Sequence, residues 1–552
     1  MNGSDIKCPL ACSTFYSVPE MGPGSSSSFA AGLLLLGAVI LAEGEKLLVV
    51  PADGSHWLSM KPVVEKIGGH GHQVVVLSPD GSLSMTNSSL YTLKYYSVKY
   101  SSQYVKASIQ KFGGSHFNRP PFPGVAITMF NLMMDVYYLF HTMCSTLLNN
   151  RELMEDLREE KFDAVLTDSF VLCGVILAEY LDVPAVNFLR GMPCSLDFSS
   201  AQCPNPLSYV PRFFSKLTDK MTFTQRLENI LMWLIEHYYC AVQYAPWEQL
   251  ASEFLKKEVN IVQLLSRISI WLLRYDFVFD YPKPIMPNMV FVGGINCKPK
   301  KPMDKEFEKL VNSSGEHGFV VFSFGSMISE IPTDKAMAIA KALGSIPQKV
   351  IWRYTGTVPS NLAENTHLVK WLPQNDLLAH PKARAFITHA GSHGIYEAIC
   401  NAVPVVMLPL FSDQMDNAVR IESRGAGVTL NVLDMTSEDL SNALKTVIED
   451  PSYKKNIEHL SALHLDRPIH PLDLAVYWVE FVMRHKGAPH LRPAAHELNF
   501  FQYHSLDIIG FLLLVMITTL FISLKCCCFA FRRCCGKRPR PQSKTKSKSK
   551  PE

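Results

Sequence analysis

Short apolar runs alternate along the first half of the chain with segments whose apolar residues recur at helical spacing. The runs lie at 46–50, 74–77 and 164–167, and each ends in a polar turn. Between them, segments 60–67 and 171–181 place their apolar residues on one helical face. Short continuous apolar runs are typical of strands buried on both faces. The pattern therefore predicts alternating strand and helix units, a parallel sheet and right-handed crossovers.

The same alternation begins again after residue 317. A Pro- and Lys-rich stretch at 297–302 separates the two series. The chain is therefore predicted to be an α/β protein with two doubly wound, Rossmann-like domains. The apolar runs of the second series lie at 318–323, 350–352, 368–369, 385–388 and 405–408.

The C-terminal part contains a longer apolar segment. Residues 506–524 include one charged residue, Asp507. As a helix this segment would be about 28 Å long, close to the thickness of a hydrocarbon core. We predict a single membrane-spanning helix there. The tail at 525–552 is rich in Lys and Arg, which predicts a cytosolic location for it.

A shorter apolar run at 29–42 is followed by small residues. We interpret residues 1–44 as a leader with a cleaved secretory signal, with translation starting at the first methionine or at Met21. The body of the protein is then expected in a lumen, where the sequons at Asn87 and Asn312 are usable for glycosylation.

Composition adds few constraints. A chain of 552 residues with 47% hydrophobic residues is long enough for two large domains and is not disordered. The net charge of +3 indicates no particular partner, and a basic tail beside a membrane segment does not require nucleic acid.

Of the 14 cysteines, the seven in the body are odd in number and irregularly spaced, so we predict mostly buried thiols and neither a disulfide framework nor a zinc site. The body cysteines are Cys144, Cys173, Cys194, Cys203, Cys240, Cys297 and Cys400.

The segment 371–417 carries the most specific chemistry. Its apolar run at 386–388 leads through a glycine loop into a segment with helical spacing. In such a turn, backbone amides and the positive end of the helix stabilise a diphosphate. Glu397, one turn into the helix, can accept hydrogen bonds from a ribose diol. The predicted diphosphate contacts are His389, Gly391, Ser392, His393 and Gly394.

Flanking residues complete a predicted nucleotide-sugar site. Trp371 offers a flat face, and Gln374 offers a paired donor and acceptor, which together suit a uracil base. Asp413 and Gln414 can bind hydroxyls of a sugar attached to the diphosphate. A lone glycine loop or histidine is a weak signal. The joint order and spacing of these groups across nearly fifty residues indicate a nucleotide-sugar site more strongly than any one of them does.

Two polar residues follow predicted strands of the first domain, His56 after 46–50 and Asp168 after 164–167. Open sheets of this type bind ligands beyond the carboxyl ends of their strands. Sugar transfer to a hydroxyl needs a base to accept the acceptor proton, and imidazole suits this near neutral pH. We predict His56 as this base and Asp168 as the carboxylate that orients it. Taken alone, either residue would more often be structural, at a helix cap or a strand end.

Together these motifs resemble the UDP-glucuronosyltransferases of animals, family 1, subfamily A. The resemblance extends from residue 46 to the basic tail, and the part after residue 316 is similar to the shared C-terminal half of that subfamily. The family's His/Asp dyad matches the segments GSHW and LTDS, although Ser169 stands where the family often has Pro. The resemblance implies the GT-B architecture, in which two Rossmann-like domains face a cleft. The expected parts are a leader and signal peptide at 1–44, an acceptor-binding domain at 45–297, a UDP-sugar-binding domain at 298–483, a connector at 484–505, a transmembrane helix at 506–524 and a cytosolic tail at 525–552.

The implied activity is transfer of glucuronic acid from UDP-glucuronate, a co-substrate, to hydroxyl groups of phenols, steroids and xenobiotics. Inversion at the anomeric carbon would give beta-glucuronides and UDP, and Ser326 would help to stabilise the leaving group. Arg353 is our hypothesis for the group that binds the sugar carboxylate. No bound cofactor and no metal are expected, because no acidic pair or His cluster has metal-site spacing.

Two alternative functions stay open. Another UDP-hexose such as UDP-glucose is the alternative donor, since Asp413 and Gln414 address hydroxyls that both sugars share. A catalytically silent lipophile-binding or partner protein is the weaker alternative, because the dyad and the donor residues are all present. The aromatic, Met and Leu residues at 130–140 and 230–239 suit an acceptor wall, core packing or membrane contact, so they do not define the acceptor.

The resemblance also implies a location, a single-pass type I protein of the endoplasmic reticulum membrane with lumenal catalytic domains. Lys548 and Lys550 resemble a lysine-based retrieval signal at the end of the tail. Expected partners are the UDP-sugar, the acceptor, membrane lipid and a second copy or a relative in a dimer. Nucleic acid is not expected.

Overall fold

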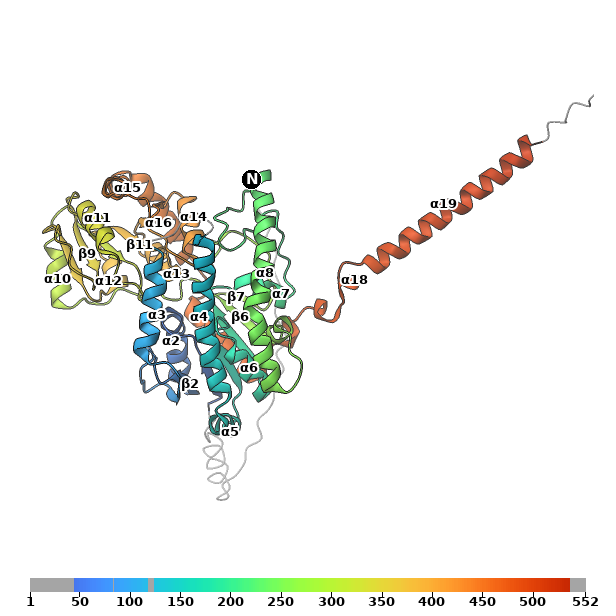
Figure 1. Cartoon of the computed structure of the whole chain (residues 1–552), viewed down its shortest axis with the longest axis horizontal. Coiled ribbons are helices and arrows are strands. Elements are labelled where there is room, and N and C mark those ends of the chain that lie inside the picture. The colour runs from blue at the N-terminus through green and yellow to red at the C-terminus, as the bar shows by residue number, and fades with distance from the viewer. Residues whose placement is uncertain (1–43, 83, 118–123, 537–552) are drawn as a thin grey trace, which may run out of the picture. The chain divides into compact units, whose positions relative to one another are not determined.

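Two parallel β-sheets form the body of the protein (Figure 1). The computed structural model describes residues 44–82, 84–117 and 124–536. The predicted leader, apart from Gly44, and the two lysines of the predicted retrieval signal, Lys548 and Lys550, lie outside the described residues.

Seven strands form the first sheet, and the apolar run predicted at 46–50 is one of its inner strands. In the parallel register, Leu48 lies opposite Val75 on one side and Val165 on the other. All three residues are buried, which explains why these strands read as continuous apolar runs. The strand order is β3 (Thr92–Tyr96), β2 (Gln73–Pro79), β1 (Lys46–Val50), β4 (Ala164–Thr167), β5 (Ala185–Leu189), β6 (Ile268–Leu273) and β7 (Met289–Phe291).

Successive side chains along a strand point to opposite faces of the sheet. Because these strands are apolar throughout, both faces must be buried, and helices cover both. Leu47 and Val49 pack with α2 (Ser55–Gly69), whereas Leu48 and Val50 belong to the core on the other face. Together the two cores make this a doubly wound unit. The helices on the second face are α4 (Gly124–Leu148), α5 (Arg151–Glu159), α6 (Cys173–Leu181), α8 (Phe223–Leu255) and α9 (Ile261–Leu265).

The second sheet has six parallel strands in the same winding order. Its central strands, β8 and β11, correspond in the order to β1 and β4 of the first sheet. The strands are β10 (Thr366–Val369), β9 (Lys349–Arg353), β8 (Phe319–Ser323), β11 (Ala383–Thr388), β12 (Val405–Met407) and β13 (Gly427–Thr429). Its covering helices are α11 (Thr333–Leu343) and α15 (Ser437–Glu449) on one face, with α12 (Gln374–Leu378), α13 (Ser392–Cys400), α14 (Gln414–Glu422) and α16 (Pro451–Leu465) on the other.

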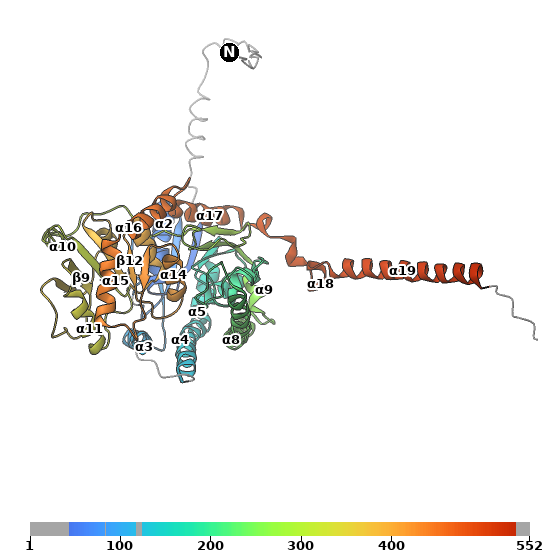
Figure 2. The ribbon, with the colours of Figure 1, turned by 90° about the horizontal axis from the view of Figure 1, so that it is seen from above.

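After the second sheet the chain returns to the first. Helix α17 (Pro471–His485) lies beside α2 (Figure 2) and contributes Ala475, Val479 and Met483 to the buried core that Leu47 and Trp57 share. This helix contains the boundary predicted between the donor domain and the connector at residue 483. The division into domains by sequence position stays a prediction. The first sheet is nevertheless covered partly by α17, a helix that follows the second sheet in the sequence.

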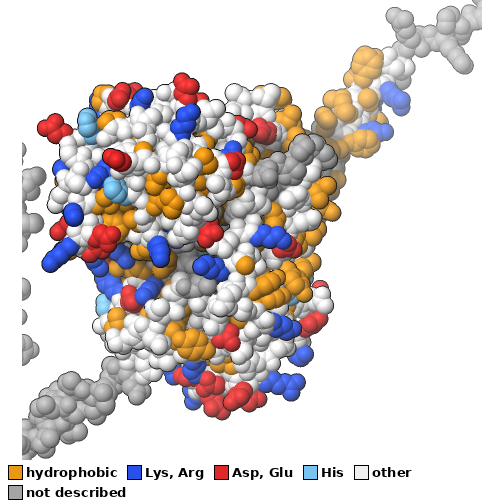
Figure 3. Space-filling view, turned by 60° about the vertical axis from the view of Figure 1, so that its left-hand side comes forward, with side chains coloured by type: hydrophobic (Ala, Val, Ile, Leu, Met, Phe, Trp, Pro, Cys, Tyr) orange, Lys and Arg blue, Asp and Glu red, His pale blue; other side chains and the backbone are white. Residues whose placement is uncertain are grey.

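Helix α19 (Leu506–Cys535) begins where the membrane segment was predicted to begin and continues past the predicted end at 524. Among the described residues it is the one helix long and apolar enough to cross a membrane. Hydrophobic side chains cover much of it (Figure 3), and none of its residues is buried within the protein. Nothing between Leu524 and Gly536 breaks a helix, so its basic, cysteine-rich end is helical as well.

The prediction that the body lacks a disulfide framework is wrong. Six of its seven cysteines are paired, and Cys203 is a buried free thiol. The paired cysteines are 29, 46 and 103 residues apart, so the spacing along the sequence carries no sign of the pairing. The disulfides are Cys144–Cys173, Cys194–Cys240 and Cys297–Cys400, with Cα atoms 5.6, 6.1 and 6.0 Å apart.

Candidate active site

His56 and Asp168 lie together at the carboxyl ends of two neighbouring inner strands of the first sheet, β1 and β4. His56 is in the first turn of α2, directly after β1, and Asp168 follows β4. Their side chains form a contact of 2.6 Å between Nδ1 of the ring and Oδ2 of the carboxylate. Because β1 and β4 are neighbours at which the winding of the sheet reverses, this is the crevice where open α/β sheets bind ligands.

The carboxylate of this pair is held rigidly, whereas the imidazole is accessible. Asp168 is 1% exposed and also accepts a hydrogen bond of 2.9 Å from the Phe170 backbone amide. The His56 side chain is 29% exposed and packs against the Phe170 ring, with centroids 5.1 Å apart. With Nδ1 donating to Asp168, Nε2 of His56 is the ring atom that can accept a proton.

The turn before His56 is shaped by a glycine and a carboxylate. Gly54 has φ of 71°, a left-handed conformation that strains residues with a Cβ. Asp53 accepts hydrogen bonds from the Gly54 amide at 2.7 Å and from the Ser82 hydroxyl at 2.9 Å, and it also pairs with Ser84. These contacts fix the point at which α2 starts and therefore the position of His56.

The predicted donor loop lies at the corresponding point of the second sheet. His389, Gly391 and Ser392 follow β11, and Ser326 follows β8, the strand next to it. Helix α13 begins at Ser392, so its free amides point toward this crevice. A Cβ added to Gly391 would be 2.5 Å from Nε2 of His389, so only glycine fits against that ring.

Glu397 is linked to two other predicted donor residues. One of its carboxylate oxygens accepts a hydrogen bond of 2.5 Å from the Gln374 amide, and the other lies 3.4 Å from Nε2 of His393. Gly394 is buried on the same helix, and a Cβ there would be 3.4 Å from the Gln374 amide nitrogen. The predicted base, ribose and diphosphate contacts are therefore adjacent.

Trp371 and Arg353 form a stacked pair at the edge of this group. The indole is 62% exposed, and the Arg353 guanidinium lies over it, 5.3 Å from the ring centroid. The same guanidinium donates to the backbone carbonyls of Gly325 and Ser326. Arg353 thus fixes the loop after β8, and its predicted contact with a sugar carboxylate stays a prediction.

Asp413 and Gln414, the predicted sugar contacts, stand at the start of α14. Gln414 is buried, and its side-chain oxygen accepts from the Leu410 and Phe411 amides at 2.8 and 3.1 Å, which positions the turn before the helix. Asp413 accepts from the Asn417 amide at 2.8 Å. Asp413 also forms an ion pair with Arg190, which directly follows strand β5 of the first sheet.

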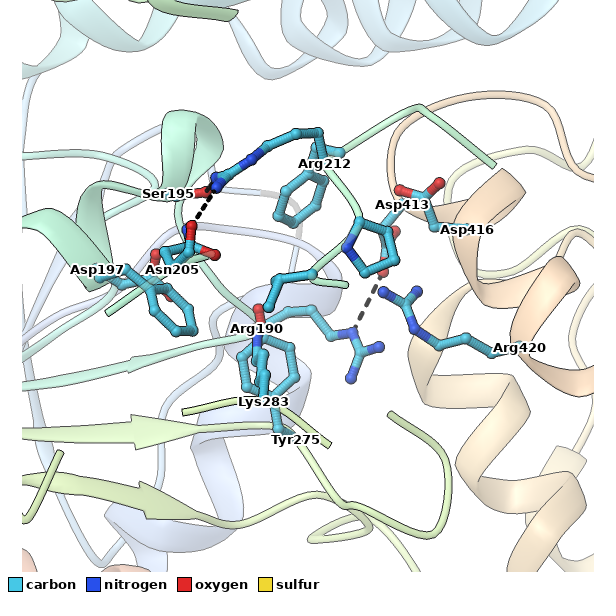
Figure 4. Close-up of a pocket in the computed structure, with 14 residues that line it drawn as sticks. Arg190, Ser195, Asp197, Asn205, Arg212, Tyr275, Lys283, Asp413, Asp416 and Arg420 are labelled. Atoms are coloured by element: carbon cyan, nitrogen blue, oxygen red, sulfur yellow. Dashed lines mark hydrogen bonds and ion pairs between the residues drawn. The ribbon is translucent and has the colours of Figure 1, made fainter. Parts of the chain in front are cut away.

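Arg190 joins the two halves of the site. It follows β5 and makes two hydrogen bonds to Asp280, at 2.9 and 3.1 Å, while its Nε lies 3.6 Å from Asp413 (Figure 4). Burial would raise the pKa of Asp280, but Arg190 and Arg420 outweigh burial and hold it below its usual value. The adjacent polar cavity of about 40 Å³ is lined by Arg190, Asp413 and Arg420 among others. The end of α14 that carries Asp413 is therefore fixed against the first half of the chain.

The His56–Asp168 pair and helix α13 are connected through residues that the sequence did not single out. Ser59, one turn after His56 on α2, has its hydroxyl 3.5 Å from Nδ1 of His393. Asn296 contacts the same ring nitrogen at 2.9 Å, and Arg274 donates to Ser59 at 2.9 Å. A lone Ser or Asn gives no sequence signal. The contacts nevertheless bring His56, the predicted base, close to the predicted diphosphate site of the second sheet.

His389 is uncharged at neutral pH. Burial lowers the pKa of its imidazole to about 4, and Arg353 acts in the same direction, although Asp413 opposes it. Hydrogen bonding, rather than a positive charge, is therefore what this ring can offer to a diphosphate.

This shift predicts acid sensitivity. The folded protein binds a proton on His389 only near pH 4, whereas the unfolded chain does so near pH 6.5, so stability is lost as the pH falls from 6.5 to 4. The full loss is about 3 kcal/mol. His389→Asn, which cannot titrate, should reduce the fall in the thermal unfolding midpoint of the detergent-solubilised full chain between pH 7 and pH 5. Equal falls for the variant and the parent would contradict the prediction.

The predicted acceptor segments divide into two groups. Tyr137 and Phe140 of α4 contact Phe170, with centroids 5.9 and 5.4 Å away, so they lie one ring removed from His56. In contrast, the apolar residues at 230–239 on α8 are largely exposed, Leu234 by 52%. The α4 residues thus suit an apolar wall beside His56.

Among the described residues, one group of side chains has metal-ligand chemistry, Cys297, Cys400 and His464. The two cysteines are joined in a disulfide, and His464 is paired with Asp276. None of the predicted site residues belongs to this group.

Solved structures share this arrangement of two sheets. The glycotransferase of kitacinnamycin aligns with a TM-score of 0.54 over 80% of this chain and 98% of its own, at 15% identity. The calicheamicin glycosyltransferase aligns with a TM-score of 0.54 over 80% and 99%, also at 15% identity. The fold is that of a GT-B glycosyltransferase.

The sequence defines the family more narrowly. Residues 45–541 match the family of UDP-glucoronosyl and UDP-glucosyl transferases, and the chain belongs to it. Human UDP-glucuronosyltransferase 1A6 is 58% identical over 95% of this chain and 99% of its own length. Human UDP-glucuronosyltransferase 1A1 is 59% identical over 94% and 97%, and the rat 1A1 protein is 58% identical over 94% and 98%.

Proposed function

We propose that the protein transfers glucuronic acid from UDP-glucuronate to hydroxyl groups of small lipophilic acceptors such as phenols, steroids and xenobiotics. The observation that carries this proposal is the contact between the two halves of the site. His56 pairs with Asp168, and Ser59, one helical turn after His56, contacts His393 of α13. The identity to UDP-glucuronosyltransferases over nearly the whole chain supports glucuronate as the sugar.

In the proposed reaction the acceptor oxygen attacks the anomeric carbon of the sugar while its proton passes to Nε2 of His56. The bond from that carbon to the diphosphate oxygen breaks, and UDP leaves with the electron pair. Asp168 stabilises the imidazolium that forms. Attack from the side opposite the diphosphate inverts the anomeric centre, so an alpha-linked donor gives a beta-glucuronide.

The leaving diphosphate would be stabilised by the start of α13. The free amides from Ser392 to Gly394 and the partial positive charge of the helix end meet the developing negative charge. Ser326 and the neutral His389 add hydrogen bonds from the neighbouring loop and strand end. The residues that would hold uracil and ribose are Trp371, Gln374 and Glu397.

We place the body in the lumen of the endoplasmic reticulum, with α19 spanning the membrane once. The three disulfides support an oxidising compartment, and the sequon residues Asn87 and Asn312 are both exposed, as glycosylation requires. We also expect the chain to pair with a second copy or with a relative, which the mass of the complex in mild detergent would test.

The donor is tested directly with microsomes that express the full chain. Either UDP-glucuronate or UDP-glucose is supplied with a panel of phenols and steroids, and products are identified by mass and by the anomeric coupling constant. The expected product is a beta-glucuronide. Transfer from UDP-glucose alone would replace the proposed sugar, and an alpha-linked product would exclude the inverting mechanism.

Glu397→Gln is expected to weaken donor binding without removing the base. A hydrogen bond to a charged group contributes roughly 1.5–3 kcal/mol, so KM for the UDP-sugar should rise about 10- to 100-fold. Glu422→Gln, on the exposed surface of α14, is the matched control and should leave this KM unchanged. If Glu397→Gln changed only the acceptor KM, the ribose role would be wrong.

A further inference from the structure

Cys297, Cys400 and His464 bring three potential metal ligands to one point of the structure. Their ligand atoms, two sulfurs and a ring nitrogen, all lie within 4.8 Å of one another. Each residue comes from a different element, Cys297 from the loop after β7, Cys400 from the end of α13 and His464 from the last turn of α16. The two cysteines form a disulfide. Its reduction would leave two thiols facing one imidazole.

The imidazole of His464 is held in the orientation that a metal ligand needs. The side chain is 2% exposed, and its Nδ1 bonds to the Asp276 carboxylate. Because an ionised carboxylate can only accept, Nδ1 carries the proton of the neutral ring and Nε2 keeps its lone pair. Nε2 is the atom that faces the cysteines, 3.7 Å from Sγ of Cys297. Metal-binding histidines are oriented by the same kind of carboxylate contact.

A glycine leaves space directly beside two of the ligand atoms. Gly294 has φ of 80°, and a Cβ added to it would be 2.2 Å from Nε2 of His464 and 3.4 Å from Sγ of Cys297. The loop around this glycine is also fixed, since Arg467 donates to the Gly293 carbonyl at 2.8 Å. Any other residue at position 294 would fill the space and strain the backbone.

Reduction and metal binding are chemically balanced at this site. A phosphine or a dithiol supplies two electrons, and with two protons the disulfide becomes two thiols. A divalent cation that binds both sulfurs displaces those two protons, so two thiolates neutralise its charge. Two zinc–sulfur bonds of about 2.3 Å at the tetrahedral angle place the sulfurs about 3.8 Å apart. With the Cα atoms of Cys297 and Cys400 6.0 Å apart, rotation of the side chains can reach this separation.

We propose that Cys297, Cys400 and His464 form a Zn²⁺ site in the reduced protein. Two thiolates and one imidazole suit Zn²⁺, which would keep a fourth position for water, whereas Mg²⁺ and Ca²⁺ prefer oxygen ligands. The cation would hold together the three elements that meet at the disulfide, in a newly made chain that is not yet oxidised. This inference does not depend on the sugar or the acceptor.

The site would also keep the donor helix in place. Cys400 is the last residue of α13, and Asn296, the neighbour of Cys297, contacts His393 in the first turn of the same helix at 2.9 Å. A link between Cys297 and Cys400, by a disulfide or through a cation, therefore holds both ends of α13 against one short segment. The reduced protein with bound Zn²⁺ is thus expected to bind UDP.

The test measures how fast each cysteine is alkylated in the reduced, detergent-solubilised full chain. The chain is reduced with a phosphine, which is then removed under argon, and iodoacetamide is added with Zn²⁺, with Mg²⁺ or with neither. Mass spectrometry of the peptides gives a separate rate for each cysteine. At a Zn²⁺ concentration about ten times the dissociation constant, Cys297 and Cys400 should react about tenfold more slowly. Mg²⁺ should have no effect.

The other two cysteine pairs are internal controls in the same sample. Within the described residues, neither pair has a third metal-binding side chain close enough to complete a site. Zn²⁺ should therefore slow their alkylation much less. Equal slowing at all six cysteines, or no slowing at Cys297 and Cys400, would overturn the proposal. The control cysteines are Cys144, Cys173, Cys194 and Cys240.

Two variants separate the proposed site from general binding to thiols. His464→Asn removes Nε2 but keeps an amide that can donate to Asp276, so it should abolish the slowing at both cysteines. His459→Asn, on the exposed side of the same helix, should leave the slowing unchanged. In Cys400→Ser, Cys297 should lose its protection.

UDP binding in the presence of Zn²⁺ verifies that each reduced protein is folded. Protection of Cys297 that persists in folded His464→Asn or Cys400→Ser would overturn the proposal. A reduced parent chain that does not bind UDP with Zn²⁺ present would overturn it as well, because the site requires the folded body.

Discussion

Replacing His56 with glutamine is expected to lower kcat about 100- to 10,000-fold, the usual range for loss of a general base. Glutamine preserves the size and polarity of the side chain but cannot accept the acceptor's proton. KM for the UDP-sugar should change little, because the contact with the donor helix is made by Ser59 and not by His56. The measurement is steady-state glucuronide formation by the full chain in microsomes, at matched protein levels.

His70→Gln is the control for this variant. His70 caps the end of the same helix, and its ring pairs with Glu480 of α17 at 2.6 Å, so it shares the helix and an acidic partner without approaching the site. Its kcat should equal that of the parent. Equal activity in His56→Gln and the parent would remove His56 from the mechanism.

Asp168→Asn should lower kcat by a similar factor, about 1,000- to 10,000-fold, through the tautomer of His56. Asp168 accepts from both the Phe170 amide and Nδ1 of His56. An asparagine oxygen can serve only one of them. If it stays with the backbone, the amide group donates to Nδ1, and the proton of the neutral ring moves to Nε2, where it blocks base catalysis.

Asp163→Asn is the matched control for this prediction. It lies just before β4, at the opposite end of the strand from Asp168. It accepts a hydrogen bond from the Lys46 backbone amide and pairs with the Lys486 side chain. Retained UDP binding would show that Asp168→Asn is folded. A folded Asp168→Asn protein with the parent's kcat would contradict the proposed role.

The sequence predicts the inner strands of both sheets well, because parallel strands that are buried on both faces appear as continuous apolar runs. The runs predicted at 46–50 and 164–167 are confirmed as β1 and β4 with the same bounds. β3, at the edge of the first sheet, is only partly buried and includes Lys94, so it lacks a continuous apolar run. Its existence depends on pairing with β2, which no local pattern reveals.

Contacts between distant elements are what the sequence could not predict. The disulfides join elements far apart in the chain, and so do the bonds of Ser59 and Asn296 to His393. Arg190 is a further example, since its role between Asp280 and Asp413 exists only when both sheets have formed. Individual Ser, Asn and Arg residues are too common for their types alone to indicate such roles.

The packing of α17 against the first sheet has a consequence for the order in which the two halves of the protein can fold. During synthesis, strands β1 to β7 leave the ribosome before any part of the second sheet, yet one side of their core lacks Ala475, Val479 and Met483 until the second sheet has followed. The N-terminal half therefore cannot mature as an independent unit in the usual sequential manner. Until nearly the end of translation, its exposed apolar face is a surface for chaperones, and a chain that stops early would be recognised as incomplete.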